Sequence, residues 1–76
     1  MRWEIEKIIA VANELNRRGS TAASTGERIA AAFVLNEMAY LPDSYRDVIE
    51  AWERLDTWQS HVKRIKRDYA HLIESH

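Results

Sequence analysis

The sequence has no cysteine, one proline and two glycines. Without cysteine, neither a disulfide nor a thiolate metal site can form, and the absence fits a reducing cytosol. So little glycine and proline argues against a β protein with many tight turns. The longest charge-free apolar run, residues 29–35, has seven residues and is far too short to span a membrane. The charged N-terminus lacks the apolar stretch of a signal peptide, so we expect a cytoplasmic protein with no membrane association.

The composition is typical of a globular chain and not of a disordered one. Apolar residues make up 46% and charged residues 30%, which is enough apolar material for a core. Seventy-six residues predict a single domain over residues 1–76. At this size a core is marginal, and tight helix packing or a second subunit commonly assists it. The net charge of −1 argues against a surface built throughout for nucleic acid.

Residues 29–35 are apolar almost all the way round a helix, and such a helix is normally enclosed by others. We therefore predict an all-α fold, a small bundle of three helices around this stretch. The last helix is long and is either kinked or broken near Asp56-Thr57, which would make four. The predicted helices cover about residues 3–17, 25–40, 44–55 and 57–74, and the last two can be continuous.

Local signals mark the ends of these helices. Gly19 follows the first apolar stripe and is a natural stop. Ser24, with Glu27 three residues later, has the capping-box pattern that begins the second helix. Pro42 disfavours helix at the residue before it, and one of residues 43–44 can cap the next helix.

The apolar stripe of the C-terminal segment changes direction along its length. On a helical wheel, its first part lies around Trp52, and its second part centres about 120° away. The residues predicted to face the core beside Trp52 are Tyr45, Val48, Ile49 and Leu55. Two structures fit this shift. The helix can break, with Asp56 as cap and Gln59 completing a capping box, or continue with its halves facing different partners.

An unbroken C-terminal helix would extend well beyond the other two. Its overhanging apolar stripe must be covered by a fold-back of the chain or by another chain. We favour a homodimer through this helix. The predicted partner or dimer interface consists of Trp58, Val62, Ile65, Tyr69, Leu72 and Ile73. Trp3 lies off the first apolar stripe, and is either a partly exposed end residue or a contact for a partner.

A cluster of positive charge lies within this segment, at Lys63, Arg64, Lys66 and Arg67. These residues can be a solvated helix face, or can contact a nucleic acid or an acidic partner. They can also pair with the acidic residues 43–56, either within the chain or in a second copy. No helix-turn-helix pattern precedes the cluster, which weakens the nucleic-acid interpretation.

The sequence predicts no catalytic residue, cofactor site or metal site. Glu37 is a candidate functional acid, because a helix over residues 25–40 would place it among apolar side chains. The alternative is that it lies near the helix end and reaches solvent. Asp68 and His71 have the i, i+3 spacing of metal ligands, but they form one pair on a basic segment that would repel a cation.

These patterns favour a non-enzymatic helical module for protein interaction. We expect a small homodimeric regulator, adaptor or inhibitor that docks on a protein partner, since three tryptophans in a short chain are typical of an interface. The alternative is a small nucleic-acid-associated regulator that uses the basic helix at residues 63–67.

Overall fold

The computed structural model describes residues 2–74 and contains four α-helices and no strand within that range. The helices are α1 (Trp3–Arg18), α2 (Thr25–Leu35), α3 (Val48–Leu55) and α4 (Gln59–Asp68). Short 3-10 turns lie at Met38–Tyr40, Asp43–Tyr45, Asp56–Trp58 and Ala70–Leu72. Met1, Ser75 and His76 lie outside the described residues. The predicted all-α bundle is confirmed.

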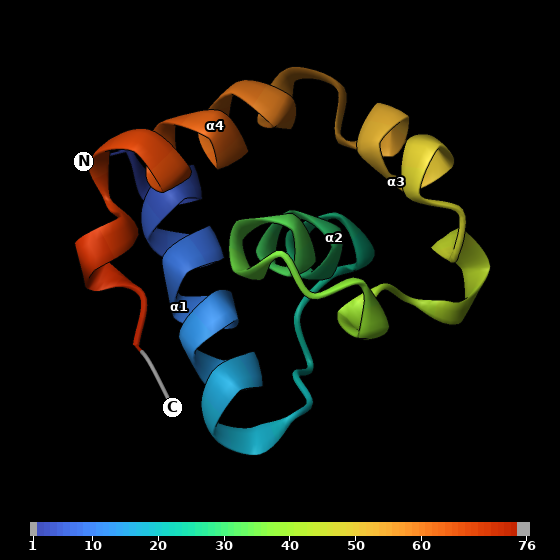
Figure 1. The fold of residues 1–76 in the computed structure, drawn as a ribbon, viewed down its shortest axis with the longest axis horizontal. Helices are drawn as coiled ribbons and strands as arrows, with labels where there is room; N and C mark the ends of the chain where they lie inside the picture. The colour runs from blue at the N-terminus through green and yellow to red at the C-terminus, as the bar shows by residue number, and fades with distance from the viewer. Residues whose placement is uncertain (1, 75–76) are drawn as a thin grey trace.

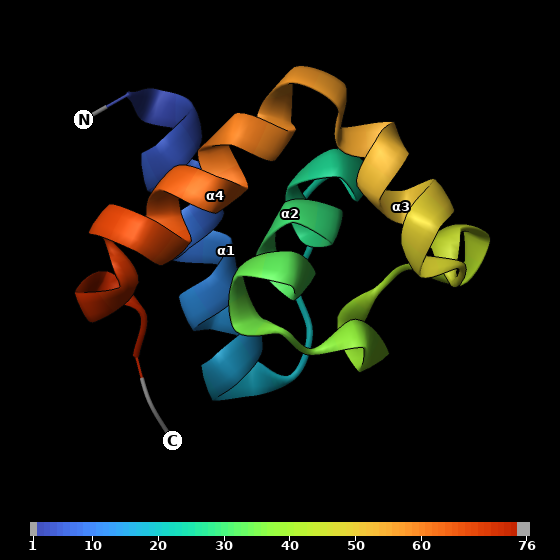
Figure 2. The ribbon, with the colours of Figure 1, turned by 45° about the horizontal axis from the view of Figure 1, so that its top comes forward.

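Helix α2 lies at the centre of the structure, with α1 and α4 on one side and α3 on the other (Figures 1 and 2). Ile29 and the three alanines at residues 30–32 have no exposed surface. The small alanine side chains let the neighbouring helices approach closely. Residues 29–35 are therefore enclosed by the rest of the chain, as their composition predicts.

The predicted signals at the end of α1 and the start of α2 are confirmed. Gly19 ends α1 in the left-handed conformation, with φ of 73°. The backbone N–H of Glu27 donates to the Ser24 hydroxyl at 3.3 Å, and the Glu27 carboxylate accepts from the Ser24 N–H at 3.1 Å. This capping box satisfies N–H groups that the first turn of a helix leaves without partners.

Helix α2 ends at Leu35, five residues before the predicted end at residue 40. Asn36 adopts the left-handed conformation, with φ of 55° and ψ of 35°, which asparagine tolerates better than most residues. The Glu37 N–H then donates to the Ala32 carbonyl at 3.0 Å, closing the helix end. Lys66 reaches across from α4 and donates to the Phe33 carbonyl at 3.2 Å. This end was not predicted, because the apolar pattern continues beyond it.

The segment after α2 is anchored to α1 and α2. Leu41 is buried in the core. The Tyr40 hydroxyl donates to the Leu15 carbonyl at 3.2 Å, and the Arg28 guanidinium donates to the Tyr40 carbonyl at 2.8 Å. Arg46 donates to the Leu41 carbonyl at 3.0 Å. The two arginine bonds give partners to the Tyr40 and Leu41 carbonyl groups, whereas the Leu15 carbonyl also accepts the Gly19 N–H at the end of α1.

Helix α3 begins at Val48, four residues later than predicted. Residues 43–45 form a separate 3-10 turn, and the cap is Asp47, whose carboxylate accepts the Glu50 N–H at 3.0 Å. The late start leaves an eight-residue helix that packs against α2 through Ala51 and Leu55. Because this side of the helix faces the core, Val48 lies at its edge and Ile49 points away.

The C-terminal segment is broken at Asp56, so the broken alternative is correct. Asp56 has φ of 50° and ψ of −119°, a conformation that belongs mainly to glycine. The predicted capping box between Asp56 and Gln59 is not formed. Instead, the Gln59 amide donates to the Trp52 carbonyl at 2.8 Å and ties α4 to the end of α3.

Helix α4 ends at Asp68, and the predicted helix to residue 74 is too long. The chain turns back after Asp68 and runs beside α1 (Figure 1). The Asn13 side chain holds it in place, donating to the Leu72 carbonyl at 3.1 Å and accepting the Glu74 N–H at 2.7 Å. Arg17 forms an ion pair with Glu74 at 3.0 Å. The overhang that favoured a homodimer is therefore absent from residues 2–74, because the chain folds back on itself.

We predict that Asp56→Gly raises the free energy of unfolding by about 1 kcal/mol. The substitution removes the Cβ that makes the positive φ unfavourable, and this gain exceeds the loss from a more flexible unfolded chain. For a domain of this size the melting temperature rises by about 4–8 °C, measurable by circular dichroism. Asp56→Ala keeps the Cβ and serves as the control. A melting temperature for Asp56→Gly at or below that of Asp56→Ala would contradict the prediction.

Candidate functional site

The predicted interface residues are divided between the core and the surface. Val62 and Ile65 are buried in the chain's own core, so in this conformation they are not available to a second chain. Trp58, Tyr69 and Ile73 are half-buried and pack against that core. Leu72 is 38% exposed. These residues therefore form an apolar face, and the fold-back within the chain covers most of it.

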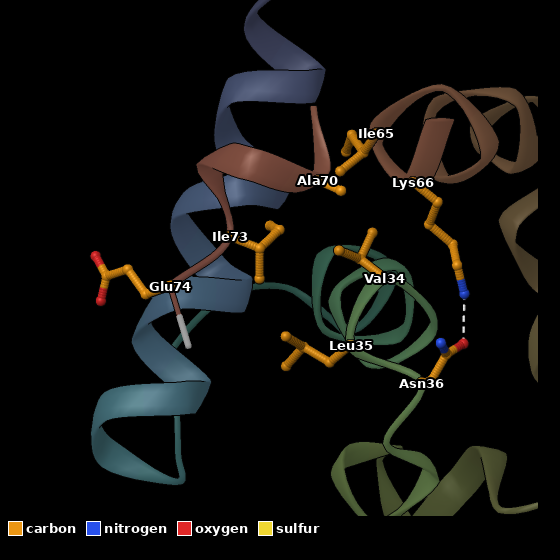
Figure 3. Close-up of a pocket in the computed structure, with 8 residues that line it drawn as sticks. All are labelled: Val34, Leu35, Asn36, Ile65, Lys66, Ala70, Ile73 and Glu74. Carbon is orange, nitrogen blue, oxygen red and sulfur yellow. Dashed lines mark hydrogen bonds between the residues drawn. The ribbon is translucent and has the colours of Figure 1, made fainter. Parts of the chain in front are cut away.

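Three of the four clustered cations share the outer face of α4. Lys63, Arg64 and Arg67 are exposed, at spacings of three and four residues that bring them to one side of a helix. Lys66 points elsewhere: its ammonium group donates to the Asn36 side chain and to a backbone carbonyl at the end of α2 (Figure 3). A cation there stabilises the C-terminal end of the helix dipole. Lys66 thus has a structural contact, while the other three cations face solvent.

Arg2, at the start of α1, adds a fourth cation to this surface. The first turn of α1 lies beside α4 (Figure 2). A hollow of about 380 Å³ is lined by Arg2, Ser60, His61, Lys63, Arg64 and Arg67. Among residues 2–74 this hollow is lined by basic and hydroxyl groups with no carboxylate. Its chemistry suits a negatively charged ligand.

Two carboxylates at the margin of the hollow hold its arginines. Arg67 donates two hydrogen bonds of 3.0 Å to Asp68, and these hold the pKa of the Asp68 carboxyl below its ordinary value. Arg64, 4.0 Å from the same carboxylate, lowers this pKa further by charge attraction. Arg2 pairs with Glu4 at 3.1 Å and likewise lowers the Glu4 pKa. Both acids therefore remain ionised near neutral pH and fix the positions of the guanidinium groups.

An aromatic cluster borders the same surface. Trp3 is 65% exposed, and its ring lies edge-on to Trp58 with the centroids 6.4 Å apart. Trp58 in turn meets the His61 ring at 5.9 Å, and His61 lines the hollow. We call the set Arg2, Trp3, Trp58, His61, Lys63, Arg64 and Arg67 the cationic platform. It combines positive charge with an exposed indole.

A second surface of opposite charge lies on α3, and we call it the acidic face: Asp47, Val48, Ile49, Glu50 and Glu53. Ile49 is 72% exposed and Val48 45% exposed. Within residues 2–74, none of the three acids forms an ion pair. An apolar centre with a rim of charge is the usual form of a protein-docking surface.

The predicted pairing between residues 43–56 and the basic cluster does not occur within the described chain. The ion pairs of residues 2–74 involve neither Glu50 nor Glu53, and on α4 Arg64 and Arg67 pair with Asp68. Lys63 lies over the Trp52 ring, 6.0 Å from its centroid, and Arg54 lies over Tyr45 at the same distance. The acidic face and the cations of α4 therefore do not neutralise each other within residues 2–74.

Glu37 lies outside α2 and is exposed. Its carboxylate accepts the Ala39 N–H at 3.4 Å and caps the 3-10 turn at Met38–Tyr40. The apolar surroundings that made it a candidate functional acid depended on a longer α2. Asp68 is engaged by Arg67, and no group of three or more potential metal ligands lies within residues 2–74.

A groove of about 350 Å³ lies between the end of α2, α4 and the C-terminal segment (Figure 3). Its apolar side chains are Val34, Leu35, Ile65, Ala70 and Ile73. Lys66, Asn36 and Glu74 lie at its polar margin. The groove marks where the C-terminal segment leaves the bundle, and it contains no cluster of groups suited to catalysis.

Val48 and Ile49 were predicted to face the core, and Arg2 was not among the predicted site residues. The wheel was centred on Trp52, the largest side chain, whereas Ala51 and Leu55 define the buried side of α3. Glu53 was a usable signal, because it lies one turn after Ile49 and on the opposite side of α3 from Ala51. For Arg2 there was no local signal, since its place beside α4 depends on how α1 and α4 pack.

Comparisons with protein-family models, with curated proteins and with solved structures give no match to this chain. Within residues 2–74, no helix has both the length and the apolar character needed to cross a membrane.

We predict that Arg67→Gln raises the pKa of Asp68 toward its ordinary value, because the two charge-assisted hydrogen bonds are lost. The Asp68 pKa is lowered in the folded state, so the pair stabilises the fold above the ordinary aspartate pKa. That contribution disappears as the pH falls through the folded-state pKa. Carboxyl chemical shifts followed against pH measure the change. Arg18→Gln, which leaves Asp68 untouched, is the control, and an unchanged Asp68 pKa in Arg67→Gln would contradict the prediction.

Proposed function

We propose that this chain is a non-enzymatic helical module that docks on a protein partner through the acidic face of α3. The observation that carries the proposal is the exposure of Ile49, at 72%, among acids that have no ion-pair partner within residues 2–74. Such a module can act as a regulator, adaptor or inhibitor, because docking alone can block or recruit a partner. We keep the expectation of a cytoplasmic location as part of this proposal.

The chemistry of the acidic face defines the partner's surface. Ile49 and Val48 offer aliphatic area, and burying an isoleucine side chain stabilises a complex by about 1.5–3 kcal/mol. Asp47, Glu50 and Glu53 surround them and would favour lysine or arginine on the partner. A cationic amphipathic helix meets both requirements, since its apolar stripe is bordered by positive charge. A partner with an acidic rim would be repelled.

The docking proposal is tested with two synthetic helical peptides of the same apolar stripe, one rimmed with lysine and the other with glutamate. We expect the lysine peptide to shift the backbone amide resonances of Val48, Ile49 and Glu53, and the glutamate peptide to leave them unchanged. Ile49→Asp should weaken binding about tenfold or more, since it removes the apolar anchor without disturbing the core.

Leu72→Asp is the matched control, because it places the same charge at another exposed aliphatic residue. It should bind the lysine peptide as the unmodified chain does. The docking proposal fails if neither peptide shifts the α3 resonances, or if Ile49→Asp and Leu72→Asp bind equally well.

Homodimerisation through the C-terminal helix is a separate part of the proposal. It depends on the part of the predicted interface that the chain leaves exposed. The predicted interface residues that retain exposed surface are Trp58, Tyr69, Leu72 and Ile73. Leu72 contributes the largest exposed aliphatic group of this set. A second copy that covers it would also cover the segment that folds back along α1.

We expect sedimentation velocity at high micromolar concentration to detect a dimer, and Leu72→Glu to shift it to monomer, because a carboxylate at the interface would be buried without a partner. Lys7→Gln, on the exposed face of α1, lowers the net charge by the same single unit and should leave the dimer intact. A monomer throughout the concentration range would contradict the homodimer proposal without affecting the docking proposal.

A further inference from the structure

The cationic platform brings together exposed cations and an exposed indole, and neither of these groups is needed to pack the core of the chain. Arg2, Lys63, Arg64 and Arg67 line one hollow of about 380 Å³ from two different helices. Lys63 and Arg64 are adjacent, and Arg67 lies one turn after them on the exposed side of α4, opposite the buried Val62 and Ile65. Positive charge in a hollow attracts anions, and several cations in a row suit a ligand with repeated charge.

Trp3 gives this surface a property that charge alone does not have. It is the most exposed aromatic residue within residues 2–74, at 65%. Among the described residues, its only aromatic neighbour is Trp58, which meets it edge-on and leaves most of the residue in solvent. A large flat side chain exposed beside cations favours a ligand that is itself flat and accompanied by negative charge.

We propose that the cationic platform binds single-stranded nucleic acid. Lys63, Arg64 and Arg67 contact successive phosphates, and an unpaired base stacks on the Trp3 indole. Aromatic stacking beside a basic groove is how proteins hold single strands with little sequence preference. The inference uses a different face from the acidic face of α3, and it does not depend on the proposed docking function.

Other anionic partners fit these observations less well. In a duplex the base faces are buried in the stack, so Trp3 would gain no contact. An acidic peptide would satisfy the cations but has no ring to place on the indole. An anionic membrane favours a surface with several inserted apolar side chains, whereas here Trp3 is the one exposed apolar side chain of the platform, and Glu4 and Asp68 pair with its arginines at the margin of the hollow.

The two acids also set the strength of binding. Arg2 is paired with Glu4, and Arg67 with Asp68, so the four cations are partly neutralised. These exposed pairs hold the guanidinium groups in place and leave further N–H donors for phosphate oxygens. We expect weak, salt-sensitive binding. If three or four phosphates are contacted, the logarithm of the association constant falls with the logarithm of salt concentration with a slope of about −2 to −3.

The test is a titration of the full chain with a thymidine oligonucleotide at two salt concentrations, followed by tryptophan fluorescence and by backbone amide resonances. We expect quenching of the fluorescence and shifts at Trp3, Lys63 and Arg64. Trp3→Leu keeps an apolar contact for Trp58 but cannot stack. It should weaken binding about tenfold, while Trp3→Tyr should retain most of it.

Lys63→Glu with Arg64→Glu should abolish measurable binding. Arg17→Glu with Arg18→Glu is the matched control, since it makes the same change in net charge in the last turn of α1, at the opposite end of the helix from Trp3. This control should bind within about twofold of the unmodified chain, because distant charges are screened by salt. A melting curve for each variant confirms that it is folded.

Several outcomes would overturn the inference. Absence of binding at low salt would do so, and so would equal loss in the platform and control variants. Equal binding of poly-glutamate would indicate an acidic protein partner, and binding of anionic vesicles without the oligonucleotide would indicate a membrane surface. Duplex DNA binding that is insensitive to Trp3→Leu would show that phosphates alone are recognised.

Discussion

The enclosure of α2 is the constraint on which the rest of the structure depends. A helix that is apolar almost all round needs cover on every side, and a chain of this length has few elements to supply it. The alanines at residues 30–32 permit close approach, so α1, α4 and α3 can surround α2 with short helices. To complete the cover, the chain must turn sharply at Asp56 and fold back after Asp68. Each turn replaces a longer helix that local propensity alone would have allowed.

The same enclosure determines which residues remain outside. Helix α3 presents Ala51 and Leu55 to α2, and this orientation leaves Ile49 in solvent among acids. Helix α4 presents Val62 and Ile65, and this leaves its cations outside beside Arg2 and Trp3. The acids and the cations therefore occupy separate surfaces. Charges that could have cancelled within the chain are available to partners of opposite kinds.

Much of the fold was predictable because its signals are local. The capping box at Ser24 and the glycine stop at residue 19 depend only on neighbouring residues, and both are confirmed. The early end of α2 was not predicted, because Asn36 closes the helix while the apolar pattern continues. In the candidate site, the basic cluster at residues 63–67 was predicted. The sequence did not indicate that Lys66 points away from the other three cations. Lys66 turns toward Asn36 across the bundle, and no spacing along α4 indicates this.

The sequence by itself determined the helical class, the apolar stretch that must be enclosed, and the local charge of each segment. These follow from periodicity, capping and composition, which act over a few residues. The tertiary structure alone decided which side of α3 is buried, that residues 69–74 return along α1 to Asn13, and that Arg2 joins the cations of α4. The physical reason is that a surface exists only after packing: residues far apart in the chain become neighbours when the core between them closes.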